Sequence, residues 1–149
     1  MSERTMMMTE DKRNNVDLLI EEFWRRGYLT LSRRFGTYLP EPGKVGPFEV
    51  DIIARYKKDY AIGINLSKQD FNGSNLTAKL LYLATRHTKF SNKKVRLFIG
   101  APSDCLRQLK IIIGGFDPET RKNIKLFPIV DKSLPTVKRY KKNTNVLFS

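Results

Sequence analysis

The stretch FEVDIIARYKKDYAIGINLSK, residues 48–68, joins two apolar runs through a short turn rich in lysine. Both runs are rich in β-branched and aromatic residues, which is typical of strands. A link this short predicts an antiparallel hairpin, with strands over 48–56 and 60–67. Acidic side chains open the first run, and polar side chains end the second. These polar positions decide how the chain is interpreted.

Side chains alternate between the two faces of a strand. We therefore expect Glu49 and Asp51 to share one face of the first strand, and Val50 and Ile52 to share the other. Ionised groups are costly to bury without a partner. The two carboxylates can face solvent, can pair with Arg or Lys, or can form part of a cluster that holds a divalent cation.

The rest of the chain predicts helices and strands in turn. Val16, Leu19, Ile20 and Phe23 share one face of a helix that begins near Asn15. The further elements expected are a strand over 28–35, a helix over 75–88, a strand over 95–102, a helix over 103–113, a short helical turn after Asp117 and a strand over 124–130. The last strand contains Pro128 and is expected at a sheet edge. This order predicts an α/β domain, a mixed sheet flanked by helices.

The length of 149 residues fits one domain. We expect residues 1–14 to be a flexible tail, 15–131 a single domain, and 132–149 a basic tail. No apolar run approaches the ~20 residues of a membrane span. One cysteine excludes an internal disulfide and indicates a reducing compartment, the cytoplasm. One histidine argues against a zinc site of His and Cys ligands.

The net charge of +13 is concentrated in the second half of the chain. Residues 61–149 carry 17 basic and 5 acidic side chains, a net charge of +12. Such an excess indicates an anionic partner, nucleic acid first and DNA ahead of RNA. A basic domain that binds acidic proteins or acts as a scaffold is the other class of function. A homodimer is compatible with the sequence, which does not decide the oligomeric state.

The order of elements, together with EVDIIA at 49–54 and AIGINLS at 61–67, resembles the PD-(D/E)XK superfamily, the restriction endonuclease-like fold. The resemblance covers roughly residues 16–100 and implies an αβββαβ core. It implies that Asp51 is the central aspartate, that Glu49 is the acid two residues before it, and that Glu22 is the helix acid that often helps to hold metal.

This chain departs from the superfamily pattern on the second strand of the hairpin. Asn65 stands where the second acid is expected, and Ser67 stands where the lysine is expected. In active members the acids hold magnesium, which activates water, and the lysine offsets developing negative charge. The resemblance implies a metal set of Glu22, Asp51 and Asn65. Either Lys68 or Lys79 would have to replace the missing lysine.

Further basic residues follow the hairpin and could contact phosphates. A solvated surface is the other interpretation of the same charges. The candidates for nucleic-acid binding are Lys79, Arg86, Lys89, Lys93, Lys94, Lys138 and Arg139. His87 is expected on the apolar face of the helix over 75–88.

The sequence therefore predicts a divergent, restriction endonuclease-like protein that binds nucleic acid through a degenerate site. Metal-dependent cleavage is expected to be lost or weakened, with magnesium binding in doubt. An active magnesium-dependent nuclease with a migrated lysine and a basic interaction domain stay open as the other two hypotheses.

Overall fold

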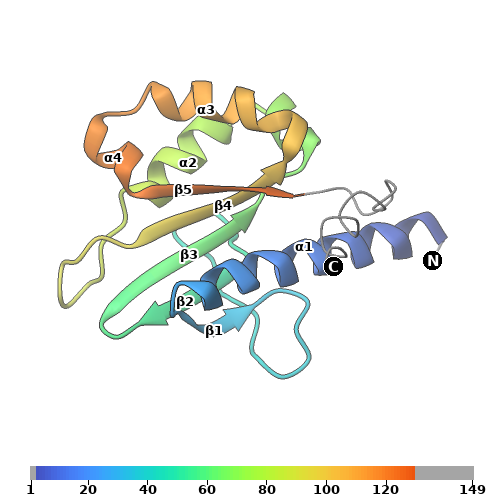
Figure 1. Cartoon of the computed structure of the whole chain (residues 1–149), viewed down its shortest axis with the longest axis horizontal. Coiled ribbons are helices and arrows are strands. Elements are labelled where there is room, and N and C mark those ends of the chain that lie inside the picture. Colours follow the sequence, from blue (N-terminus) through green and yellow to red (C-terminus); the bar gives the residue numbers. More distant parts are fainter. Residues whose placement is uncertain (1–2, 130–149) are drawn as a thin grey trace, which may run out of the picture.

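A computed structural model describes residues 3–129, with side chains from residue 11 onward. These residues form a five-stranded mixed sheet with helices on both faces, as the sequence predicts for an α/β domain (Figure 1). The strands are β1 (Leu29–Arg33), β2 (Ile52–Tyr56), β3 (Asp59–Asn65), β4 (Arg96–Pro102) and β5 (Ile124–Ile129). The α-helices are α1 (Glu3–Arg25), α2 (Leu76–Ala84), α3 (Leu106–Gly114) and α4 (Pro118–Lys122), with short 3-10 turns η1 (Lys68–Asn72) and η2 (Ser103–Cys105).

The strands lie in the order β1-β2-β3-β4-β5. The first three pair antiparallel, and the last three pair parallel, so β3 is the strand at which the sheet changes type. The predicted hairpin is confirmed, because β2 and β3 pair antiparallel from Ile52 opposite Gly63 to Tyr56 opposite Asp59. The strand that contains Pro128 lies at the edge, where its missing N–H costs no ladder hydrogen bond.

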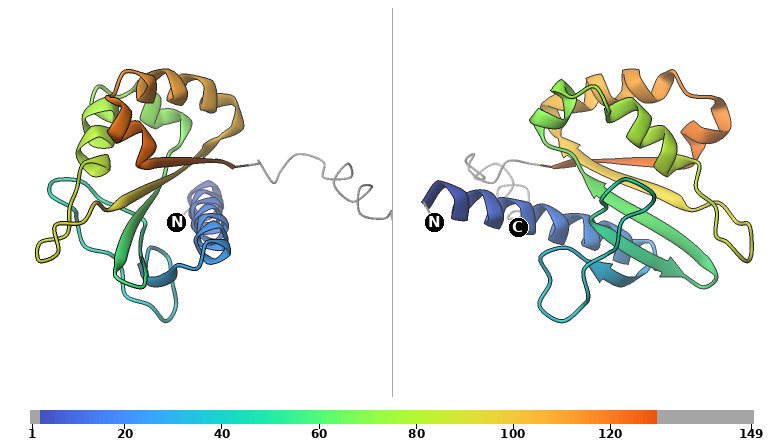
Figure 2. Two further views of the ribbon diagram at one scale, coloured as in Figure 1. Left: turned by 60° about the vertical axis from the view of Figure 1, so that its left-hand side comes forward. Right: turned by 180° about the vertical axis from the view of Figure 1, so that it is seen from behind.

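Each face of the sheet buries its own apolar cluster. On one face α1 packs Val16, Leu19 and Phe23 against β2, β3 and β4, and the rings of Phe23 and Phe98 stack 4.3 Å apart. Helices α2 and α3 lie on the other face (Figure 2). The cluster on that face buries Leu80 and other aliphatic side chains. The predicted amphipathic face of the first helix is therefore confirmed.

Helix α1 begins at Glu3, well before the start expected near Asn15, so residues 3–14 of the expected flexible tail over 1–14 are helical. The apolar repeat that reveals packing begins only at Val16, but residues 3–14 contain no Gly or Pro and many good helix formers. The predicted basic tail over 132–149 lies outside the described residues. In the part of the chain that the structure describes, no helix is both long and apolar enough to cross a bilayer.

Helix α2 ends at Ala84, four residues earlier than predicted. The Thr85 hydroxyl donates to the carbonyl of Leu81 at 2.8 Å, and the chain then turns into a loop over 85–95. His87 is consequently exposed on this loop and does not lie on the apolar face of the helix, so that prediction is wrong.

Candidate functional site: the Asp51 cavity and the basic end

Asp51 lies just before β2, and its carboxylate contacts the chain at the end of β1 and at the end of β3. Its Oδ2 accepts the backbone N–H of Asn65 at 2.7 Å. Its Oδ1 faces the guanidinium of Arg34 at 3.4 Å, and the backbone N–H of Arg34 donates to the Asp51 carbonyl at 2.9 Å. The carboxylate thus replaces a main-chain carbonyl as the acceptor for the last N–H of β3.

The chain is irregular at this position. Val50 packs into the cluster under α2 and α3, whereas Ile52 packs into the cluster under α1. The prediction that Val50 and Ile52 share a face is therefore wrong, and regular strand β2 begins only at Ile52. The backbone N–H of Asp51 donates to Gly63, which is also the register partner of Ile52. Asp51 and Ile52 thus both lie opposite Gly63, as in a β-bulge. This irregularity directs the Asp51 carboxylate toward Asn65.

The pKa of Asp51 is raised above its ordinary value because the carboxylate is buried. The Asn65 N–H and the charges of Arg34 and Lys79 act in the opposite direction and lower it. The side chain of Asp51 is 13% exposed. The raised pKa shows that desolvation outweighs the stabilising contacts of the ionised form.

A polar cavity of about 370 Å³ opens beside Asp51 between α1, α2 and the ends of β2 and β3. Its charged lining residues are Lys12, Arg34, Glu49, Asp51, Asp70 and Lys79. Three of these side chains are basic and three acidic, so the cavity has no excess of either charge. Of the two lysines considered as replacements, Lys79 is the one that lines this cavity, from α2.

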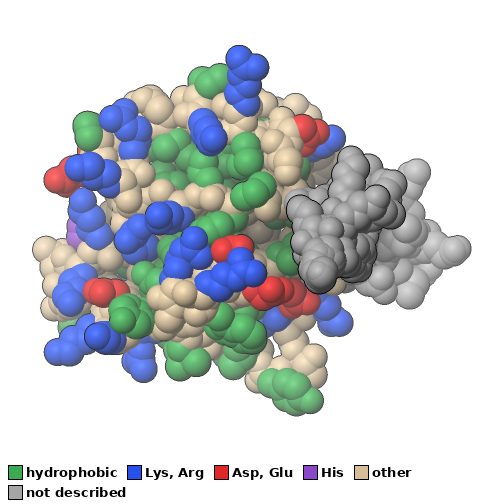
Figure 3. All heavy atoms as spheres, in the orientation of Figure 1, with side chains coloured by type: hydrophobic (Ala, Val, Ile, Leu, Met, Phe, Trp, Pro, Cys, Tyr) green, Lys and Arg blue, Asp and Glu red, His purple; other side chains and the backbone are tan. Residues whose placement is uncertain are grey.

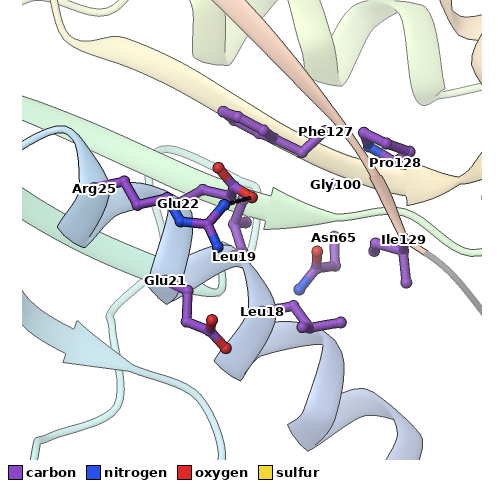
Figure 4. Close-up of a pocket in the computed structure, with 10 residues that line it drawn as sticks. All are labelled: Leu18, Leu19, Glu21, Glu22, Arg25, Asn65, Gly100, Phe127, Pro128 and Ile129. Atoms are coloured by element: carbon purple, nitrogen blue, oxygen red, sulfur yellow. Dashed lines mark hydrogen bonds and ion pairs between the residues drawn. The ribbon is translucent and has the colours of Figure 1, made fainter. Parts of the chain in front are cut away.

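Glu22 does not line the Asp51 cavity. The α1 residues that do so are Lys12, Asn15 and Val16, and Glu22 follows Asn15 by seven residues, about 10 Å along the helix. Glu22 instead lines a second cavity of about 180 Å³, where it forms an ion pair with Arg25 at 3.2 Å (Figure 4). It also pairs with Arg26 at 3.1 Å. The structure therefore separates the expected helix acid from Asp51.

Asn65 reaches both cavities from the end of β3. Its amide lies near Leu18 and Ile129 in Figure 4. Within residues 3–129, neither its Oδ1 nor its Nδ2 has a hydrogen-bond partner. A Cβ at Gly100 would overlap Asn65 Oδ1, so the glycine on β4 makes room for this side chain.

Ser67 and Lys68 each contact an acidic residue other than Asp51. The Ser67 N–H donates to Asp70 at 2.7 Å and its hydroxyl donates to the same carboxylate at 3.2 Å, which is how a polar residue caps a helical turn, here η1. Lys68 lies 2.9 Å from Asp104, whose pKa is lowered by that hydrogen bond. Lys68 does not line the Asp51 cavity.

The donors present do not fit a magnesium ion. The position where the resemblance implies a second acid holds Asn65, a neutral amide whose oxygen lies against Gly100, and of the other acids of the cavity Asp70 accepts hydrogen bonds from Ser67. Arg34 and Lys79 bring two positive charges to the same carboxylate. Among residues 3–129 no three acidic, His or Cys side chains form a group that could hold a metal.

Of the five basic candidates within residues 3–129, three lie at the opposite end of the sheet. Lys89, Lys93 and Lys94 are exposed on the loop 85–95, which enters β4, and Lys93 lies 3.6 Å from Asp59 at the start of β3. The site at Asn65 lies at the other end of this seven-residue strand, about 20 Å away. The turn between β2 and β3 adds Lys57 and Lys58, which were not among the predicted candidates, although the KK pair in the predicted turn is visible in the sequence.

We call Lys57, Lys58, Lys89, Lys93 and Lys94 the basic end. Lysine and arginine side chains gather over this part of the molecule in Figure 3. Asp59 and Glu119 pair with Lys93 and Lys94, which leaves an excess of three positive charges.

Arg86 lies beyond the end of α2 and does not share a helical face with Lys79. The guanidinium of Arg86 lies 3.7 Å from the centre of the Tyr82 ring, and its Nε donates to the Tyr82 carbonyl. Lys79 lies half-buried at the Asp51 cavity. The remaining basic candidates, Lys138 and Arg139, lie outside the described residues.

Comparison of this chain with protein-family models, with curated proteins and with solved structures finds no match. Its function therefore has to be inferred from its own side chains.

Proposed function

We propose that this protein binds nucleic acid through the basic end and does not cleave it in a metal-dependent reaction. The observation that carries the proposal is the excess of lysines on two adjacent loops, exposed and with few acidic neighbours. Cations spaced along a surface neutralise phosphates and release counterions, and this supplies sequence-independent affinity. The order of elements and EVDIIA also favour a divergent, restriction endonuclease-like origin.

The same geometry argues against cleavage. Asp51 accepts a main-chain N–H and faces Arg34, and the second acid is replaced by Asn65. A fixed positive charge at Ser67 is also missing, and losing one such contact typically lowers a rate by about 10²–10³. We therefore derive no metal-dependent cleavage step from these residues.

Fluorescence polarisation with labelled DNA and RNA tests the proposal. If about four phosphates are neutralised, affinity for a single strand falls by about 50-fold between about 50 and about 200 mM salt. Binding to acidic proteins through a scaffold surface would leave nucleic acids unbound at low salt. Undetectable binding to varied DNA and RNA at low salt would overturn the proposal.

One observation favours a second candidate, an active nuclease with a migrated lysine. Lys79 lines the cavity beside Asp51, and its charge lowers the pKa of that carboxyl. Incubation of supercoiled DNA and of RNA with magnesium or manganese decides between the candidates. We expect no nicking above background. Nicking that both Asp51→Ala and Lys79→Ala abolish, but Lys68→Ala does not, would establish the nuclease.

A further inference from the structure

The loop 85–95 presents an aromatic ring among the lysines of the basic end. Phe90 lies at its tip and is fully exposed, with a relative accessibility of 102%. Lys89 precedes it directly, and Lys93 and Lys94 follow within four residues. The Phe90 ring contributes nothing to the core and is accessible to a partner on all sides.

The tip is held in one conformation by hydrogen bonds within the loop. The N–H of Thr88 donates to the Lys93 carbonyl at 2.9 Å, and the N–H of Asn92 donates to the Thr88 carbonyl at 3.0 Å. The Thr88 hydroxyl accepts the N–H of Lys93 at 3.1 Å and contacts the hydroxyl of Ser91. Asn92 adopts a left-handed φ of 53°, which Asn tolerates in turns. These contacts close the loop, with Phe90 between Thr88 and Asn92 at its tip.

The loop lies beside the turn between β2 and β3, and the Lys93–Asp59 pair links the two (Figures 1 and 2). Lysines thus flank Phe90 in the sequence, and the neighbouring turn carries Lys57 and Lys58. Exposed aromatic rings and a row of cations are the two parts from which proteins build surfaces for single-stranded nucleic acid, because every unpaired base has a free π-face.

We propose that Phe90 stacks on an unpaired base of a single-stranded nucleic acid while lysines of the basic end bind the phosphates on either side. This deepens the proposed function and rests on it. A base pair inside a duplex has no free face for the ring, so the single strand is the preferred ligand. The lysines argue against an uncharged apolar partner, because such a partner would leave their charges unmatched.

Polarisation assays with a labelled oligo(dT) or oligo(U) of about 20 nucleotides, longer than the usual site of about 4–16 nucleotides, test this stacking. A duplex of equal length is measured in parallel. We expect Phe90→Ala to weaken binding to the single strand by about 5- to 100-fold and to leave duplex binding unchanged. Phe90→Trp should restore the affinity, whereas Phe90→Leu, which keeps the apolar bulk without the ring, should not. Tyr38→Ala removes another exposed ring, 95% accessible, and serves as the matched control.

A spectroscopic arm reports the contact directly. Trp24 is the sole tryptophan of the chain, so Trp24→Phe combined with Phe90→Trp places a single fluorophore at the loop tip. Quenching by oligo(dT) is expected from a stacked base. A blue shift with vesicles that contain anionic lipid, without quenching by the oligonucleotide, would overturn the proposal in favour of a membrane surface.

The outcomes separate the two proposals. If Phe90→Ala binds the single strand as tightly as the native protein while salt still weakens binding, the stacking proposal fails and nucleic-acid binding through the basic end stands. If neither single strand nor duplex binds at low salt, the proposed function itself fails.

Discussion

Asp51→Ala is the perturbation that most sharply separates a structural carboxylate from a catalytic one. The substitution removes the acceptor that the Asn65 N–H uses at 2.7 Å and the partner of Arg34 at 3.4 Å. In an active metal site, crowded acids repel one another, and removing one often relieves strain on the fold. Here the neighbours of Asp51 are a main-chain donor and two cations, so the opposite result follows.

The magnitude can be worked from these contacts. An N–H left unsatisfied at a buried position costs about 1–3 kcal/mol. The partly exposed pair with Arg34 adds less than about 1 kcal/mol. Relief from burying the charge acts in the other direction, as the raised pKa of Asp51 indicates. We expect a net loss of about 1–3 kcal/mol in the free energy of unfolding, or a fall of about 3–10 °C in Tm.

Urea and thermal unfolding followed by circular dichroism measure this loss. Asp51→Asn keeps an oxygen that can accept the Asn65 N–H and should lose less than half as much. Glu49→Ala, which removes an exposed acid lining the same cavity, is the matched control and should stay within about 0.5 kcal/mol of the native protein. An Asp51→Ala protein as stable as the native one, or more stable, would refute the structural role.

Two further predictions follow from the same cavities. Because burial raises the pKa of Asp51, the folded state keeps a proton that the unfolded state releases, and the free energy of unfolding of the native protein should fall as the pH rises from the ordinary aspartate pKa to the raised one. Asp51→Asn should abolish this fall in urea titrations across pH, and identical pH profiles for the two proteins would contradict burial of Asp51 as its cause. Gly100→Ala should destabilise the fold by about 1–3 kcal/mol because its Cβ meets Asn65 Oδ1; adding Asn65→Ala should recover most of the loss, and a Gly100→Ala protein of native stability would disprove the contact.

The sequence predicted the sheet well because its signals are local. The turn at residues 57–58 and the alternating runs beside it led to the correct hairpin, and the period of Val16, Leu19 and Phe23 led to the correct buried face of α1. The start of α1 was missed, since residues 3–14 form helix without an apolar repeat. The end of α2 was missed because the Thr85 hydroxyl bonds back to Leu81.

The candidate site was harder to predict because it depends on where distant segments meet. Strict alternation placed Val50 and Ile52 on one face, but the irregular backbone at Asp51 turns them to opposite faces. Glu22 lies on the correct face of α1 but about two turns beyond the residues that line the Asp51 cavity. The choice between Lys68 and Lys79 also required the fold, since Asp104 lies far along the chain from Lys68.

The central claim is that the basic end binds nucleic-acid phosphates, and the most direct test removes equal charge at two places. Lys89→Gln with Lys93→Gln removes two charges from the basic end, and Arg107→Gln with Lys110→Gln removes two exposed charges from α3. In polarisation assays over about 50–200 mM salt, each phosphate contact to a single strand contributes about 0.7 to the slope of log affinity against log salt. We predict a slope shallower by about 1.4 for the first variant and unchanged for the second. Equal slopes for both variants, or a loss confined to the α3 variant, would contradict the account.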